Sequence, residues 1–245
     1  MIAPRSAIRW FDELDSTNAE ARRLAEAGET GPSWIAARRQ TAGRGRRGRA
    51  WETGEGNLAA TLLVALDKPP AEAAQMSFVA ALAVGDLARR YASGGVAYKW
   101  PNDVLLSGRK LAGVLIESGR RQDGLLWWAV GVGVNLRSAP EGTEFPATSL
   151  AAAGGAVPTP AEALGVLADA MDVRMAAWTS EGFEAVRRDW LKDALGLGGP
   201  CAARLPRETV EGVAEGLDPD GALVLRLADG EVRRITAGDV FFGGT

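Results

Sequence analysis

Residues 125–136 alternate between bulky apolar side chains and very small ones, and this pattern strongly limits the possible folds. In an extended chain, successive side chains point to opposite faces. One face would carry Trp128, Val130, Val132 and Val134, and the other would carry Ala129, Gly131, Gly133 and Asn135. The first face predicts a strand buried against a hydrophobic core. Glycine inside a strand marks close approach by a ligand or by another segment. The second face therefore predicts either a binding site or tight packing on a helix expected over residues 71–91.

The remaining periodicity predicts a mixed sheet with helices, followed by a small all-β module. We expect strands over residues 7–14, 33–37, 57–66, 96–100, 104–106 and 110–117, and helices over 71–91, 158–178 and 181–195. A further helix begins near Thr17 and Glu20, which have capping-box spacing. Residues 196–200 form a linker, and turns at 218–221 and 229–230 predict hairpins beyond it. The expected fold class is α/β (α+β), with one domain over residues 1–197 and a β module over 198–245.

A glycine-arginine run over residues 43–49 predicts an anionic partner. Its sequence is Gly-Arg-Gly-Arg-Arg-Gly-Arg, and Arg38 and Arg39 precede it. Residues 38–49 contain no acid, so this stretch carries +6 in a chain of net charge −3. Guanidinium groups match carboxylates and phosphates, and glycine lets the backbone fold tightly around them. Charge alone leaves open a nucleic acid, a membrane or a small phosphate compound.

The chain has no histidine and one cysteine, Cys201, which excludes several kinds of active site. Histidine-dependent triads, histidine general bases and histidine metal sites are impossible, and so is an internal disulfide. Without a histidine to activate it, Cys201 is expected to be a small buried residue. The longest apolar stretches are too short to span a membrane, and the N-terminus has no apolar leader. We therefore expect a cytoplasmic protein.

Lysine is scarce: the chain has 24 arginines and four lysines. Two of the four, Lys99 and Lys110, lie within one short segment, which makes both candidates for a specific role because an ammonium does not replace a guanidinium. Residues 99–103 combine a cation, an aromatic ring, an amide and a carboxylate on one turn. Trp51 closes the arginine run and could stack on a flat ring.

Taken in order, five segments of the chain resemble the biotin–protein ligases. They are Ser16–Asn18, Gln40–Trp51, Lys99–Asp103, Arg109–Gly113 and Gly133–Asn135. The resemblance implies a catalytic domain related to class II aminoacyl-tRNA synthetases and an SH3-like C-terminal module. It implies that MgATP activates biotin to biotinyl-5′-AMP, and that biotin then passes to one lysine of the biotin carboxyl carrier protein of acetyl-CoA carboxylase or a related carboxylase. The chain resembles the form of the family without an N-terminal DNA-binding domain, so no DNA partner and no membrane partner are expected.

The resemblance also implies roles for particular residues. Catalysis is expected from Lys110, Arg46 and Asp103. Biotin binding is expected from Ser16, Thr17, Asn18, Gln40, Arg44, Gly45, Arg46, Lys110, Gly113, Gly131 and Gly133. Contacts to ATP or the adenylate are expected from Arg46, Trp51, Asn102, Lys110 and Asn135, and contacts to Mg²⁺ from Asn102 and Asp103. Family members can form homodimers by joining sheet edges, and a homodimer is possible here.

We expect residues 43–52 to form a lid that orders over bound biotin and adenylate, because ordering such a chain costs roughly 1–2 kcal/mol per residue for the backbone. Arg44 and Arg46 should face the ligand, and Arg47 and Arg49 should mostly face solvent. Two alternative functions stay open. A lipoate- or octanoate-protein transferase shares the fold, but its motifs are not found. An RNA- or DNA-binding module is disfavoured because the basic charge is confined to one loop and the pI is about 5.3.

Overall fold

The computed structural model describes residues 6–66, 68–69, 72–121 and 124–243, which form two sheets. The larger sheet has seven strands in the order β1 (Ala7–Leu14), β2 (Ser33–Gln40), β3 (Leu58–Ala65), β7 (Leu126–Val134), β6 (Arg109–Arg120), β5 (Asp103–Leu106) and β4 (Val96–Lys99). β1 runs parallel to β2, and the other neighbouring pairs are antiparallel. The mixed α/β fold expected from the sequence is confirmed.

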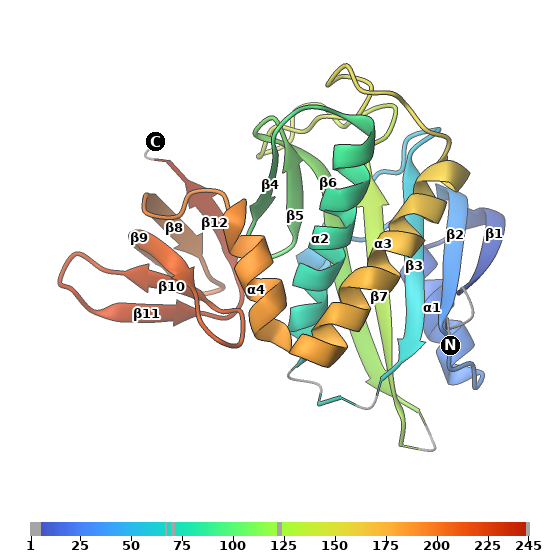
Figure 1. Ribbon diagram of the computed structural model, residues 1–245, viewed down its shortest axis with the longest axis horizontal. Coiled ribbons are helices and arrows are strands. Elements are labelled where there is room, and N and C mark those ends of the chain that lie inside the picture. The colour runs from blue at the N-terminus through green and yellow to red at the C-terminus, as the bar shows by residue number, and fades with distance from the viewer. Residues whose placement is uncertain (1–5, 67, 70–71, 122–123, 244–245) are drawn as a thin grey trace.

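Helices cover both faces of this sheet (Figure 1). α2 (Ala73–Tyr91) and α3 (Pro160–Glu181) lie across one face, and α4 (Phe183–Lys192) packs against both of them. They enclose the main hydrophobic core, which includes Trp34, Trp128 and Trp178. α1 (Thr17–Glu26) covers the other face, where a smaller core forms around Ile35 and Leu63. No helix in the described part of the chain is long and apolar enough to cross a membrane.

The alternation predicted for residues 125–136 is observed in β7. Its bulky face, with Trp128 and Val130, lies in the main core beneath α2 and α3. Its small face lies on the opposite side of the sheet, where a β-carbon on Gly131 would overlap the amide of Asn18 and one on Gly133 would overlap the indole of Trp51. The glycines therefore do not make room for α2. They let a polar side chain and an aromatic ring approach the backbone of the strand.

The capping box expected at Thr17 and Glu20 is wrong. The N-cap of α1 is Ser16, whose side chain makes no capping hydrogen bond. The Thr17 hydroxyl instead lies 2.8 Å from that of Thr61, and Glu20 forms an ion pair with Arg23. A capping box does begin α3, where the Thr159 hydroxyl accepts a hydrogen bond from the Glu162 amide and the Glu162 carboxylate accepts one from the Thr159 amide.

The second sheet is a five-stranded antiparallel module that corresponds to the expected SH3-like tail. Its order is β11 (Val232–Ile235), β10 (Leu223–Arg226), β9 (Thr209–Leu217), β8 (Pro200–Arg204) and β12 (Asp239–Phe242). It docks beside β4 and α4 (Figure 1). The buried indole of Trp100 donates a hydrogen bond of 3.0 Å to the Gly221 carbonyl, so the turn after β4 is tied directly to this module. The domain boundary at residues 197 and 198 stays a prediction.

Candidate active site

A cavity of about 420 Å³ lies on the α1 side of the large sheet, between the arginine loop, the loop over residues 140–147 and β12. The structure brings all the site residues predicted from the sequence to its walls. They are Ser16, Thr17, Asn18, Gln40, Arg44, Gly45, Arg46, Trp51, Asn102, Asp103, Lys110, Gly113, Gly131, Gly133 and Asn135. Their individual roles toward biotin, ATP and Mg²⁺ stay predictions.

The floor of the cavity is a lateral row of residues that crosses four adjacent strands. Strand register pairs Gly133 with Gly113, Gly113 with Asp103, and Asp103 with Lys99. Directly paired residues in neighbouring strands present their side chains on the same face. The row therefore changes from bare backbone in β7 and β6 to a carboxylate in β5 and an ammonium in β4. A flat group fits the first half, and a charged group fits the second.

One end of the cavity is a polar cluster held together by hydrogen bonds. The Thr61 hydroxyl donates to Asn18 Oδ1 at 2.7 Å, and Asn18 Nδ2 donates to Glu117 at 2.8 Å. The amide nitrogen of Thr17 donates to Gln40 Oε1 at 2.8 Å. Ser16, Thr17 and Asn18 are each about 4% exposed. Buried polar groups held in this way are oriented before a ligand arrives and can recognise a polar ring.

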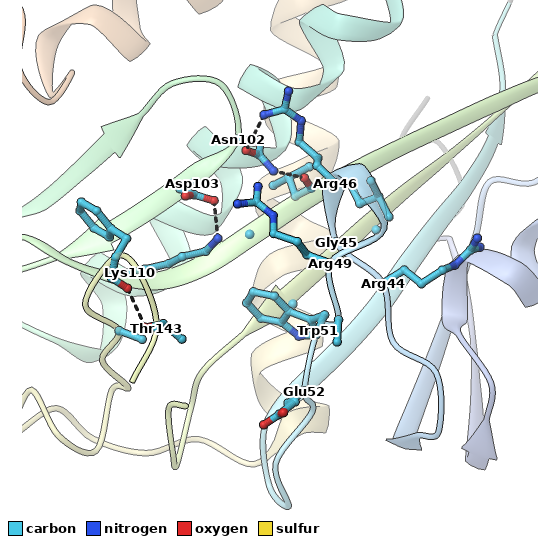
Figure 2. Close-up of a pocket in the computed structure, with 18 of the residues that line it drawn as sticks. Arg44, Gly45, Arg46, Arg49, Trp51, Glu52, Asn102, Asp103, Lys110 and Thr143 are labelled. Atoms are coloured by element: carbon cyan, nitrogen blue, oxygen red, sulfur yellow. Dashed lines mark hydrogen bonds and ion pairs between the residues drawn. The ribbon is translucent and has the colours of Figure 1, made fainter. Parts of the chain in front are cut away.

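The arginine loop closes over the glycine half of the floor. Gly45 N donates to Arg49 O at 2.7 Å and Trp51 N donates to Gly43 O at 2.9 Å, so the loop folds back on itself. This places the Trp51 indole against Gly133 and Gly113, with Lys110 Nζ 5.6 Å from its ring centroid (Figure 2). An aromatic ring above bare backbone is suited to hold a flat ligand.

Arg44 and Arg46 leave the loop in different directions (Figure 2). Arg44 forms an ion pair of 3.5 Å with Glu117, near the polar cluster. Arg46 donates hydrogen bonds to Asn102 Oδ1 at 3.4 Å and to the Gly238 carbonyl at 3.2 Å. Burial lowers the pKa of Arg46, and the charge of Asp239 opposes that shift. Both residues line the cavity, as expected.

The expectation that Arg47 and Arg49 mostly face solvent is wrong in one respect. Both are partly exposed, but each forms an ion pair with the same carboxylate, that of Asp239 in β12. The distances are 2.9 Å from Arg47 and 2.8 Å from Arg49. These two arginines therefore fasten the loop to the C-terminal module.

Lys110 and Asp103 form an ion pair of 2.7 Å at the charged half of the floor (Figure 2). Asn102 Nδ2 donates to the Val114 carbonyl at 2.6 Å, which turns its Oδ1 toward Arg46. Asn135 is buried, and its amide donates to the Thr148 carbonyl at 3.1 Å. Asn135 thus supports the wall of the cavity as well as lining it.

The residues present do not form a magnesium site by themselves. Among the residues that the structure describes, no three carboxylate, cysteine or histidine side chains gather where they could hold a metal ion. Asp103 is paired with Lys110, and Asn102 Oδ1 accepts from Arg46. Mg²⁺ in nucleotide sites is commonly held by one or two carboxylates together with substrate phosphates. The protein could therefore add at most a minor share of the ligands to such an ion.

Sequence reasoning missed the contribution of the C-terminal half to this site. Asp239, Val240 and Phe241 from β12 line the cavity, as do Glu144 and Phe145 from the 140–147 loop. Asp239 lies 190 residues from Arg49, and its sequence neighbourhood gives no indication of that contact. The acidic charge of Asp239 opposite the basic loop is the one feature that could have suggested it.

Comparisons with known proteins agree with this geometry. A model of the biotin/lipoate A/B protein ligase family matches residues 10–135, and a model of the biotin protein ligase C-terminal domain matches residues 196–243. A biotin–[acetyl-CoA-carboxylase] ligase of Paracoccus denitrificans is 45% identical over 94% of this chain and 98% of its own. The bifunctional ligase/repressor BirA of Bacillus subtilis is 32% identical over 96% of this chain and 73% of its own.

A comparison with solved structures also finds a biotin protein ligase. The biotin protein ligase from Aquifex aeolicus in complex with biotin and ATP has a TM-score of 0.80 and 27% identity, with 97% of this chain and 99% of that chain covered. A cavity lined by these motifs, a family model that spans half of the chain, and a relative that matches it almost end to end lead to one conclusion: the chain belongs to the biotin/lipoate A/B protein ligase family.

Proposed function

We propose that this protein is a biotin–protein ligase that activates biotin with ATP and transfers it to a lysine of a biotin carboxyl carrier protein. The observation that carries the proposal is the single cavity in which a polar cluster, a glycine floor beneath Trp51, and the cations Arg46 and Lys110 meet. In the first step, a biotin carboxylate oxygen attacks the α-phosphorus and pyrophosphate leaves. In the second, the acceptor amine attacks the acyl carbon and AMP leaves.

The polar cluster suits the ureido ring of biotin. That ring has two N–H donors and a carbonyl acceptor, and Ser16, Thr17, Asn18 and Gln40 offer both kinds of partner. From this end, the valeryl chain would run along the floor toward Lys110, with Arg44, Gly45 and the glycines at 113, 131 and 133 around it. Because Asn18 and Trp51 already touch the glycine face, we propose that the ring system lies against these two side chains.

Adenylation brings together two anions, so charge neutralisation and alignment dominate its requirements. Arg46 and Lys110 reach the cavity from the loop and from β6, and no histidine is needed. A preorganised donor of this kind is typically worth about 10²–10³ in rate. Trp51 would stack on adenine, and Asn102 and Asn135 would lie near the phosphates. Asp103, bonded to Lys110, is proposed to assist the acceptor lysine in the second step.

Mg²⁺ would arrive with the triphosphate, since the protein offers it only Asn102 and Asp103. Its chemistry would be to neutralise phosphate charge. All other contributions proposed here belong to side chains of the protein.

The test is direct. The protein is incubated with biotin, MgATP and a biotin carboxyl carrier domain. Mass spectrometry of the acceptor then shows whether its mass increases by one biotinyl group. Parallel reactions with lipoate and with octanoate examine the transferase alternative. Lys110→Met should abolish modification while its circular dichroism spectrum stays that of the wild type. Modification by lipoate or octanoate but not by biotin would refute the proposal.

We further propose a cytoplasmic enzyme that needs no DNA and can form a homodimer through β1. In the described part of the chain, β1 pairs with a strand on one side alone, and its Ile8 and Trp10 are 42% and 36% exposed. An unpaired edge with exposed apolar side chains can accept a second copy. Sedimentation velocity compares the oligomeric state of Trp10→Lys with that of the wild type, with and without biotin and ATP. The wild type should form dimers and Trp10→Lys should stay monomeric. A wild-type monomer at all accessible concentrations would refute it.

A further inference from the structure

Lys99 is a buried lysine whose ammonium forms no ion pair with a carboxylate among the described residues. It ends β4, it is 7% exposed, and it lines the cavity. Within the residues that the structure describes, its ammonium makes no hydrogen bond or ion pair. Its Nζ lies instead 4.9 Å from the ring centroid of Phe145 and 5.8 Å from that of Phe241. The other three lysines each pair with an acid at 3.0 Å or less: Lys68 with Glu72, Lys110 with Asp103, and Lys192 with Asp189.

This arrangement costs free energy unless an anion approaches the ammonium. An ammonium removed from water is destabilised unless an anion compensates it. Burial lowers the pKa of Lys99. The charges of Asp103 and Asp239 oppose that shift only in part, and both carboxylates already pair with other cations. Two aromatic faces attract a cation but replace its hydration only partly. A buried lysine that lines a cavity and has no acidic partner is suited to bind an anion that enters with a ligand.

The position of Lys99 indicates which anion this is. In the lateral row of the floor, Lys99 is the register partner of Asp103 and stands at the end farthest from Gly133. Lys110 belongs to β6, and β4 lies two strands further out. Two strand spacings separate the backbones of β6 and β4 by roughly 9–10 Å, and Asp103 lies between them, paired with Lys110 and in register with Lys99. An α-phosphate beside Lys110 would therefore extend its β- and γ-phosphates past Asp103 toward Lys99, while the flat groups lie against Asn18 and Trp51.

We propose that Lys99 binds the β- and γ-phosphates of ATP and holds the pyrophosphate leaving group; the inference rests on the proposed ligase function. In adenylation, the biotin carboxylate oxygen forms a bond to the α-phosphorus, and the bond from that phosphorus to the α,β-bridging oxygen breaks. The electron pair remains on the bridging oxygen, which departs with the β-phosphate. The Lys99 ammonium compensates this new charge and keeps its proton.

The experiment compares two half-reactions in Lys99→Met, which keeps the apolar stem and removes the charge. Biotin-dependent ATP–pyrophosphate exchange requires a pyrophosphate site, whereas transfer from preformed biotinyl-5′-AMP to the acceptor does not. We expect exchange to fall by about 10²-fold, as for loss of one positioned charge donor, with a higher KM for pyrophosphate. Transfer from the adenylate should stay within about twofold of wild type, by the same reasoning. Lys99→Arg keeps the positive charge and should recover part of the exchange. Lys192→Met, an exposed control, should change neither rate.

Equal losses in both half-reactions, or unchanged exchange, would overturn the proposal. A merely structural role would lower the melting temperature of Lys99→Met, whereas removal of an uncompensated buried charge should leave it equal or raise it. Calorimetry with inorganic pyrophosphate and with AMP adds a direct measurement. Pyrophosphate should bind the wild type and bind Lys99→Met at least tenfold more weakly, and AMP should bind both alike. Failure of the ligase function itself would differ, because the wild type would then modify no acceptor even from preformed adenylate.

Discussion

The two ion pairs of Asp239 should set how often the arginine loop opens. Its carboxylate is 16% exposed and pairs with Arg47 at 2.9 Å and with Arg49 at 2.8 Å, whose side chains are 35% and 56% exposed. Discounted for this exposure, each pair is worth roughly 0.5–1 kcal/mol. The Asp239→Asn substitution keeps the shape and removes the charge. Loss of about 1–2 kcal/mol shifts an equilibrium by about 5- to 30-fold. The population of the open loop should therefore rise by that factor.

Limited trypsin digestion measures this population, because the protease cleaves after exposed arginines and its rate follows the fraction of open loop when closing is fast. The initial cleavage rate within residues 43–49 of Asp239→Asn should rise by about 5- to 30-fold, and the KM for ATP should rise in parallel. Asp229→Asn, a change of equal charge in the turn between β10 and β11, serves as the control and should behave as wild type. Equal cleavage of Asp239→Asn and wild type would refute the assignment of Asp239 as the fastening residue.

Three further predictions concern the floor and the thiol. Gly131→Ala should lower the free energy of unfolding in guanidinium by about 1–3 kcal/mol, because its methyl would displace the Asn18 amide from Thr61. An unfolding midpoint equal to that of the wild type would contradict this prediction. Gly133→Ala displaces Trp51 on the loop, so it should raise the KM for ATP by about tenfold, equivalent to about 1.4 kcal/mol, with the unfolding midpoint nearly unchanged. Burial raises the pKa of Cys201 from an unfolded value of 9.0 to about 11. Its contribution to stability is therefore fully present below pH 9 and lost as pH rises toward 11, and at pH 8 a thiol reagent should label it only after unfolding.

The parts of the site that depend on local pattern were predictable from the sequence. The alternation in β7 separated a bulky core face from a face of small residues, because side-chain direction in a strand follows from residue order alone. The predicted site residues all reach one cavity, because their motifs lie in the arginine loop, at the start of α1 and on one face of adjacent strands. Whether glycine made room for a ligand or for a helix was not predictable. The answer depends on which side of the sheet α2 takes.

Side-chain contacts between residues that lie far apart in the sequence were not predictable either. The exposure expected for Arg47 and Arg49 was judged from the composition of their own loop, whereas Asp239 approaches from a different sheet. The capping-box spacing at Thr17 and Glu20 failed because Thr61, from the neighbouring β3, engages the Thr17 hydroxyl. At Thr159 and Glu162 the same spacing has no such competitor, and the box forms.

The edge strand β4 continues into the connection to the C-terminal module through backbone hydrogen bonds. Tyr98 N donates to Asp193 O at 2.9 Å and Leu195 N donates to Tyr98 O at 2.8 Å, beside Lys99. Residues 193–195 thus behave as a short extra strand at the edge of the large sheet. For protein engineering, this sets where the chain can be divided. A fragment that ends after Leu197 would keep residues 193–195 paired with β4, whereas one that ends before Asp193 would leave an open edge on the strand that carries Lys99.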